Sequence, residues 1–224
     1  MKKLTRKKKI ELTILGIVIL WNLFMLFVGR PLRLRSYISM YPTTIKGDVL
    51  YINKLTYLFS SPQRGDITLS TDRTDEKLEI SKDDFIKILH PIYWNKDYKS
   101  IAIVPFGPFK PANVKRIIGL PGETIEIIDK QVYINGEKYT HGSEIFIDES
   151  IFNEWEFEGR LNMPAIKIPE RHYFIMGDNR DISRDSRSFG LINEKDIKGK
   201  ISIKLLTHEN GKKQFFVKIN KKIN

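Results

Sequence analysis

The chain has 224 residues, a formal net charge of +11 and no cysteine. Without cysteine it has no disulfide, thiol nucleophile or cysteine-ligated metal, so covalent catalysis would need another side chain. The charge is mostly terminal: residues 1–35 carry a net +8 and the tail 212–224 adds +5, whereas 36–211 carry a net −2. A nucleic-acid-binding domain carries its basic patch on the fold itself, so this distribution argues against nucleic acid as a partner.

The N-terminal part predicts a membrane anchor over 10–29, preceded by a basic cytoplasmic segment over 1–9. No charge occurs from Leu12 to Gly29, and a helix of this length spans about 27 Å, close to the bilayer hydrocarbon thickness. The run is longer than the apolar part of a signal peptide and lacks a small-x-small cleavage site after it, which favours an uncleaved anchor. Six basic residues precede it and three follow. The sequence therefore predicts a single-pass protein of the cytoplasmic membrane, with residues 30–211 on the outer face.

The remainder predicts a mainly β domain, an antiparallel barrel or folded sheet. Short runs rich in Ile, Val, Tyr and Phe are separated by Gly, Pro, Asn and Asp. Asp129-Lys130 and Asn135-Gly136 are typical of tight hairpin turns. Two stretches interrupt this pattern, 71–113 and 140–168, and we interpret them as insertions or a second lobe. A short helix is expected from Ser81 within the first. The predicted strands are 47–54, 65–70, 100–104, 114–120, 124–128, 131–134, 173–176, 200–206 and 214–219.

A serine and a lysine are the candidate catalytic pair. Ser39 follows the end of the apolar run by ten residues, and a serine nucleophile needs a base within hydrogen-bond reach. The four histidines form no Ser-His-Asp pattern, only His172 lies near a motif, and no metal-binding run is present. Lys115 lies among apolar residues on a predicted strand. A lysine pKa near 10.4 must fall by about three units for the amine to act as a base, which burial can cause. The alternative is that Lys115 is an ordinary surface lysine.

Read together, the motifs resemble the bacterial type I signal peptidases, the membrane-anchored Ser/Lys endopeptidases of the secretion pathway. Each motif alone is weakly specific, but all of them occur in the order of the family and cover most of the chain. They are the anchor 12–29, Ser39-Met40-Tyr41-Pro42-Thr43 with Gly47-Asp48, Arg64-Gly65-Asp66-Ile67, the run from Val114 to Glu123, and the run from Gly177 to Arg187 leading into Phe189-Gly190.

The resemblance implies a role for each matched residue. Ser39 would be the acyl-forming nucleophile, Lys115 the general base, and Ser183 a hydrogen-bonding partner that orients the lysine amine. Met40 would line the substrate cleft, and Pro42 would stiffen the backbone after the nucleophile. No cofactor or metal is implied. An ion-pair scaffold behind the pair would consist of Arg116, Asp178, Arg180, Asp185 and Arg187.

The chain departs from the family pattern just before the nucleophile. Tyr37 and Ile38 stand where many members have Ser or Gly, so the hydroxyl that assists the oxyanion in some relatives has no serine counterpart. Loss of one oxyanion donor costs about 10² to 10³ in rate. The Tyr37 phenol and the Ser39 backbone N–H are the donors that remain. Glu123, where Asp is common, is a milder change.

The resemblance also implies the partners. The substrates would be secretory preproteins with small residues at the first and third positions before the cut, bound as an extended strand at the membrane and supplied by the protein-export machinery. Two alternatives remain. One is a Ser/Lys protease dedicated to a single pilus or conjugation protein; soluble self-cleaving repressors are disfavoured by the anchor. The other is a catalytically silent, membrane-anchored binding domain, against which the joint presence of Ser39, Lys115 and Ser183 argues.

Overall fold

The computed structural model describes residues 5–34, 39–71, 92–95, 100–103, 112–146, 161–209 and 211–219. The chain forms two compact units. The first consists of Met1–Arg30 with Asp75–Lys110, and the second of Pro31–Thr74 with Pro111–Asn224. The predicted helix from Ser81 lies outside the described residues.

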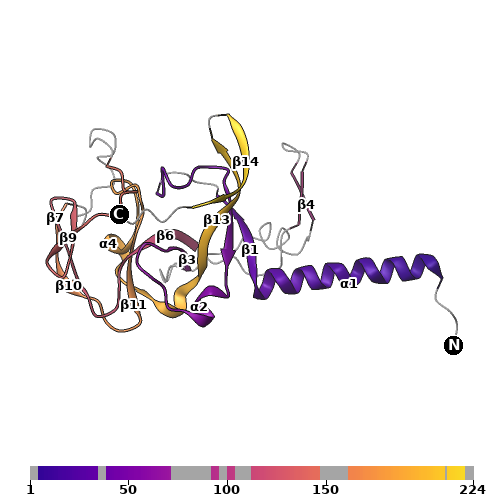
Figure 1. The fold of residues 1–224 in the computed structure, drawn as a ribbon, viewed down its shortest axis with the longest axis horizontal. Helices are drawn as coiled ribbons and strands as arrows, with labels where there is room; N and C mark the ends of the chain where they lie inside the picture. Colours follow the sequence, from indigo (N-terminus) through magenta and orange to yellow (C-terminus); the bar gives the residue numbers. More distant parts are fainter. Residues whose placement is uncertain are drawn as a thin grey trace, which may run out of the picture. The chain divides into compact units, whose positions relative to one another are not determined.

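The first unit is dominated by one helix, α1 (Arg6–Phe27), drawn in indigo in Figure 1. Thr5 caps it by accepting a hydrogen bond from the Lys8 backbone N–H, as polar residues at this position commonly do. The helix begins at Arg6 and so includes basic residues that were expected to precede the anchor. Among the described residues, no helix combines the length and apolar character needed for a membrane crossing. The predicted transmembrane anchor over 10–29 is therefore not supported by the structure. The first unit also contains an antiparallel strand pair, β4 (Ile92–Asn95) and β5 (Ser100–Ile103).

The second unit is built on an eight-stranded sheet with the order β1-β2-β13-β3-β6-β11-β12, and β14 pairs with β13. Every pairing with a described register is antiparallel. β13 is long and lies between β2 and β3, and register shifts within both pairings mark bulges or irregularities along it. The sheet consequently curls, which confirms the predicted mainly β, antiparallel class. The strands are β1 (Gly29–Arg33), β2 (Val49–Asn53), β3 (Ile67–Thr71), β6 (Ala112–Gly119), β11 (His172–Met176), β12 (Ile192–Asn193), β13 (Ile197–Glu209) and β14 (Lys212–Lys218).

A second sheet of four strands has the order β10-β7-β8-β9. Its strands are β7 (Thr124–Ile128), β8 (Gln131–Ile134), β9 (Glu137–Tyr139) and β10 (Met163–Lys167). Asp129, Lys130, Asn135 and Gly136 all have positive φ, as expected for two-residue hairpin turns. Both predicted turns are confirmed.

The small sheet packs against β6 and β11 at a point where only glycine fits. A Cβ atom at Gly119 would collide with the Ile168 side chain and touch the Cβ of Phe174. Apolar side chains of both sheets fill this interface, which fixes the ends of β6 and β11. The buried residues of this core are Ile118, Ile125, Ile127, Val132, Ile134, Ile168, Phe174 and Met176.

Candidate active site

Lys115 and Arg116 lie on β6, a central strand with β3 on one side and β11 on the other. The register pairs Lys115 with Thr68 and Arg116 with Met176. Neighbouring residues of a strand point to opposite faces, so the Lys115 and Arg116 side chains lie in different environments. Lys115 is 3% exposed and Arg116 is 1% exposed. The burial that a lysine base requires is therefore present.

Burial changes the acid-base behaviour of Lys115. Desolvation lowers its pKa to about 8 from an ordinary value of 10.5; Asp185 and Asp178 raise it and Arg187 lowers it further. At about pH 7 roughly a tenth of the amines would then be neutral, compared with about 3 in 10⁴ for an unperturbed lysine. The buried position thus supplies an uncharged amine at near-neutral pH.

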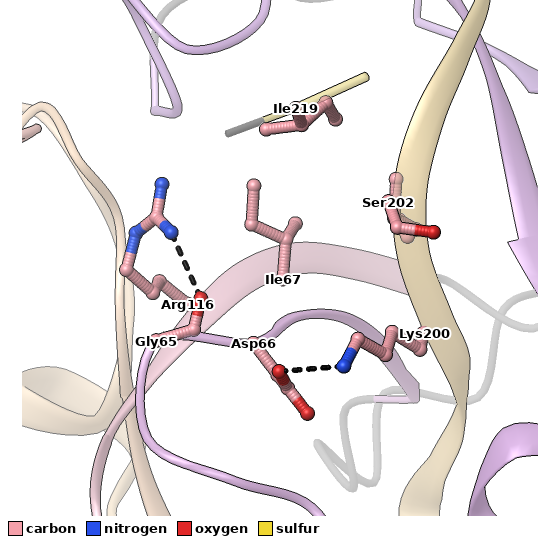
Figure 2. Close-up of a pocket in the computed structure, with 8 residues that line it drawn as sticks. Gly65, Asp66, Ile67, Arg116, Lys200, Ser202 and Ile219 are labelled. Carbon is pink, nitrogen blue, oxygen red and sulfur yellow. Dashed lines mark hydrogen bonds and ion pairs between the residues drawn. The ribbon is translucent and has the colours of Figure 1, made fainter. Parts of the chain in front are cut away.

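Behind β6, Arg116 forms a two-pronged ion pair with Asp178. Its Nε donates to Oδ1 at 2.7 Å and its Nη2 to Oδ2 at 2.6 Å, with both side chains almost fully buried. Nη1 donates to the Gly65 carbonyl oxygen at 2.9 Å, a bond visible in Figure 2. Thr43 donates its hydroxyl to Asp178 Oδ2. This network joins the turn after Ser39 to β6 and to the end of β11.

A second buried ion pair is centred on Asp185, which caps the short helix α4 (Ser186–Phe189). Its carboxylate accepts from Arg187 Nε at 2.8 Å, Arg187 Nη2 at 2.9 Å and the Gly177 N–H at 2.9 Å. Burial alone would raise the pKa of Asp185, but the Arg187 guanidinium and the Gly177 N–H outweigh it and hold the pKa below its usual value. Asp185 therefore stays ionised and fixes the loop beyond β11.

Gly177 lies against the backbone of Ser39 and the side chain of Ser183. A Cβ atom there would collide with Ser183 Oγ and with the carbonyl oxygen of Ser39. The Asn179 N–H donates to that same carbonyl at 3.2 Å. Met176 pairs with Arg116, so the next residue, Gly177, lies beside Lys115 on the adjoining strand. Among the hydrogen bonds of the described residues, none joins Ser39 to the Lys115 amine, and the buried Ser183 Oγ has no partner.

Other predicted site residues occupy varied environments. Arg180 is buried, donates from Nε to the Gly177 carbonyl at 3.2 Å, and has a pKa lowered by burial. Met40 packs in an apolar core with strand residues of β2, β3 and β6, and Pro42 is exposed. Tyr37 lies outside the described residues. His172 is the first residue of β11, and its Nδ1 lies 2.9 Å from the Glu170 carbonyl oxygen.

His141 lies beside the Arg116–Asp178 pair, although no motif in the sequence singles it out. It is buried in the turn after β9, with Nε2 at 3.4 Å from Arg116 Nη1 and Nδ1 at 3.1 Å from Ser143 Oγ. Burial, followed by the positive charge of Arg116, lowers its pKa. A neutral imidazole can accept from the arginine, whereas an imidazolium would repel it. The proximity of His141 to Arg116 can be recognised only in the folded protein.

A cavity of about 30 Å³ lies on the Arg116 side of β6. Figure 2 shows Arg116 bonded to Gly65 at one side of it, and Asp66 paired with Lys200 at the other, with Nζ and Oδ1 2.9 Å apart. This volume suits a water molecule and is far too small for a peptide. Within the part of the chain that the structure describes, no group of three His, Asp or Glu side chains is arranged to hold a metal. The lining residues are Gly65, Asp66, Ile67, Arg116, Lys200, Ile201, Ser202 and Ile219.

Three comparisons relate the chain to known proteins. The family model described as "Signal peptidase, peptidase S26" matches residues 7–206. The chain is 33% identical to Signal peptidase I V of Bacillus subtilis over 171 residues, covering 74% of this chain and 79% of the relative. It is 30% identical to the Probable signal peptidase I-1 of Synechocystis over 193 residues, covering 86% and 79%. A crystal structure of a signal peptidase I from Enterococcus faecalis shares 24% identity with a TM-score of 0.37, covering 63% of this chain and 97% of that one.

Proposed function

Since the chain belongs to the signal peptidase family S26, we propose that it is a serine endopeptidase that removes N-terminal signal peptides from secretory preproteins with a Ser39/Lys115 dyad. The observation that supports the dyad most strongly is the burial of Lys115, with a pKa of about 8, beside the glycine that adjoins Ser39. A lysine with its ammonium in water could not remove a proton from a serine efficiently.

The proposed reaction proceeds in two stages. Neutral Lys115 takes the proton of Ser39 Oγ as that oxygen attacks the carbonyl carbon of the scissile bond. The tetrahedral intermediate collapses to an ester, and Lys115 returns the proton to the departing amine, which becomes the N-terminus of the mature protein. Lys115 then takes a proton from a water molecule that attacks the ester, and it returns that proton to Ser39 Oγ as the ester bond breaks, which releases the signal peptide with a free carboxyl end and restores both residues.

The surrounding residues would position this pair. Ser183 Oγ is fully buried beside Gly177 and has no partner among the described residues, so it is available to orient the lysine amine. The pairs Arg116–Asp178 and Asp185–Arg187 hold the loops that carry Ser183 and adjoin Ser39. Removing one partner of such a buried pair costs about 3 to 5 kcal/mol, because the other charge is left uncompensated. The Ser39 N–H and the Tyr37 phenol are the oxyanion donors we propose.

We place this reaction at the outer face of the cytoplasmic membrane, with α1 as the membrane attachment and the N-terminus in the cytoplasm. Support comes from the charge-free sequence from Leu12 to Gly29 and from the exposed apolar side chains along α1, among them Ile17 and Leu20. Such side chains favour a lipid environment over water. Protease protection of the basic N-terminus in sealed membrane vesicles would test this topology; digestion from the outer face would refute it.

The decisive assay uses the purified full chain in detergent with a preprotein that carries small residues at the first and third positions before its cleavage site. Ser39→Ala and Lys115→Met should each abolish cleavage, whereas Lys138→Ala, on an exposed position of β9, should cleave at the wild-type rate. Full activity of either dyad variant would overturn the assignment. A parallel panel of pilin-like substrates separates a broad signal peptidase from a dedicated maturation protease.

A further inference from the structure

His141 lies beside the Arg116–Asp178 pair, and the proposed reaction gives it no role. It belongs to the stretch 140–168, which the sequence predicted only as an insertion or a second lobe. The His141 side chain is 4% exposed, and its Nε2 lies 3.4 Å from Arg116 Nη1. A Cβ atom added at Gly65 would lie only 3.0 Å from the same Nε2. The imidazole is therefore enclosed between the loop before β3 and the arginine.

The contact with Arg116 determines which ring nitrogen of His141 carries the proton. A guanidinium has N–H donors and no acceptor, so Nε2 can bond to Arg116 only through its lone pair. In the neutral ring the proton then lies on Nδ1, which is 3.1 Å from Ser143 Oγ and can donate to it. The contacts thus require the neutral Nδ1–H tautomer of His141.

Arg116 links His141 to the turn that contains the nucleophile. Its Nε and Nη2 bind the two carboxylate oxygens of Asp178, which also accepts from the Thr43 hydroxyl. Thr43 lies four residues after Ser39. A displacement of the guanidinium would therefore move a carboxylate that is bonded to the nucleophile turn, and small displacements of reacting groups lower rates strongly.

The segment around His141 is also bonded directly to the loop after β11. The Ile145 N–H donates to the Asp178 carbonyl oxygen at 2.8 Å, and the Arg180 N–H donates to the Ile145 carbonyl oxygen at 3.0 Å. The Glu144 carboxylate accepts from the His141 N–H at 3.0 and 3.1 Å. These bonds fix the backbone near the imidazole, which is consequently held against the guanidinium.

Protonation of His141 would place two cations in contact. The charged ring has an N–H on both nitrogens, so Nε2–H would face Arg116 Nη1–H. Burial lowers the pKa of His141 most and Arg116 comes second; Arg180 lowers it too, whereas Asp178 and Glu144 raise it. The two charged residues beside Gly65 have partners of opposite sign, in the pairs Arg64–Glu123 and Asp66–Lys200.

We propose that His141 is a positioning residue of the active site: its neutral Nδ1–H form fixes Arg116 and thereby the nucleophile turn, and its protonation in acid releases this network. The inference rests on the proposed function, since it concerns the same site, but it assigns a role to a residue outside the family motifs. Acid then inactivates the enzyme in two steps. Protonation of Lys115 removes the base, and protonation of His141 displaces the groups around Ser39.

The tautomer can be measured without any cleavage. Full-length protein with isotopically labelled histidine rings is studied in detergent by NMR, and His141→Gln identifies the signals of residue 141. Long-range couplings between ring protons and nitrogens show which nitrogen is protonated. At about pH 8 we expect the proton on Nδ1, and we expect the ring to stay mostly neutral at about pH 6.5, the ordinary histidine pKa. An Nε2–H tautomer would overturn the proposal, as would a ring that is mostly charged at that pH.

Cleavage kinetics test the step in acid. Below about pH 8 the neutral fraction of Lys115 falls about tenfold per pH unit, so log rate against pH has a slope of about 1. The wild-type slope should steepen towards about 2 by about pH 5, because His141 is protonated as well. His141→Gln keeps an acceptor for Arg116 but takes up no proton in this range, so its slope should stay at about 1. His208→Gln, at an exposed position of β13, should steepen as the wild type does.

A third variant tests the acceptor itself. At about pH 9, His141→Phe should cleave about tenfold more slowly than His141→Gln, because it offers Arg116 no acceptor and a hydrogen bond to a charged group is lost. Equal rates of the two variants, or equal acid slopes of wild type and His141→Gln, would overturn the proposal. If His141→Phe does not fold, as judged by circular dichroism, the tautomer and the slopes still decide.

These outcomes are distinct from failure of the catalytic proposal. A wild-type protein that cleaves no preprotein at any pH would refute the Ser39/Lys115 assignment, and the tautomer of His141 would still be measured in the same sample. Normal cleavage together with an Nε2–H tautomer would refute the role of His141 alone.

Discussion

Replacing Lys115 with methionine should stabilise the protein at neutral pH while abolishing its activity. Methionine has a similar length but no charge, so it suits a site that is 3% exposed. The pKa of Lys115 falls from 10.5 to about 8 chiefly through desolvation. At about 1.4 kcal/mol per pKa unit, the fold disfavours the charged amine by about 3 kcal/mol. The wild-type protein bears this cost whenever the amine is protonated, and the variant does not.

The pH dependence has a definite sign. The free energy of unfolding rises with pH wherever the unfolded chain binds more protons than the folded one. Between a folded pKa of about 8 and an unfolded pKa of 10.5, Lys115 is protonated only in the unfolded chain. Wild-type stability should therefore gain about 3 kcal/mol across this window, and the methionine variant should lack that gain. The variant's advantage should be largest below about pH 8 and disappear near pH 10.5.

The measurement is denaturant unfolding of both proteins, followed by far-ultraviolet circular dichroism in the same detergent at several pH values. Other titrating groups are common to both proteins, so the difference between the two isolates Lys115. Ser39→Ala is the matched control, because it should lose activity without a pH-dependent stability difference in this range. Wild-type cleavage should rise by about tenfold from pH 7 to pH 9. A stability difference that is constant from about pH 6 to pH 10 would refute a buried amine with a lowered pKa.

Two further substitutions test the surroundings of the base. Gly177→Ala should lower cleavage by about 10²-fold, because the added methyl group collides with Ser183 Oγ and the Ser39 carbonyl and so displaces the nucleophile; a single-turnover rate equal to that of wild type would contradict this. Arg187→Met leaves Asp185 without its guanidinium partner, so the carboxylate should raise the pKa of the base and shift the midpoint of the pH-rate profile to higher pH. An unchanged midpoint would show that the pair does not control the base.

The sequence predicted individual strands and turns well, because their signals lie in neighbouring residues. Alternation of apolar residues located β7 and β8, and Asn135-Gly136 located the turn beyond β8. It could not predict the sheet order, because β13 pairs with β2 and β3 from distant parts of the chain, and the bulges in both pairings depend on tertiary packing. It also missed β10, which contains Pro164 and forms an edge of the small sheet, where proline is tolerated. The tail predicted over 212–224 contains β14, in agreement with the strand predicted over 214–219.

The site was predictable only as far as its motifs extend. The sequence selects Ser39, Lys115 and the charged loop as candidates because their order along the chain resembles a family, and their roles stay predictions. The contacts of Thr43 with Asp178, 135 residues apart, and of His141 with Arg116 depend on the folded path of the chain. No periodicity or spacing encodes such pairs. The prediction that Lys115 acts as a base required its side chain to be buried. That burial follows from the position of β6 between two other strands.

The two buried ion pairs make the lysine base electrostatically feasible. Asp185 and Asp178 both act to raise the pKa of Lys115, and an unpaired carboxylate beside it would keep the proton on the amine. Each carboxylate is instead bound by an arginine, Asp185 by Arg187 and Asp178 by Arg116. Arg187 also lowers the pKa of Lys115 directly and so offsets Asp185, which leaves desolvation as the largest influence on that pKa. Buried ion pairs contribute little net stability compared with apolar packing. For the base we propose, their value is therefore electrostatic: they fix the loops around Gly177 without leaving an unpaired carboxylate that would keep Lys115 protonated.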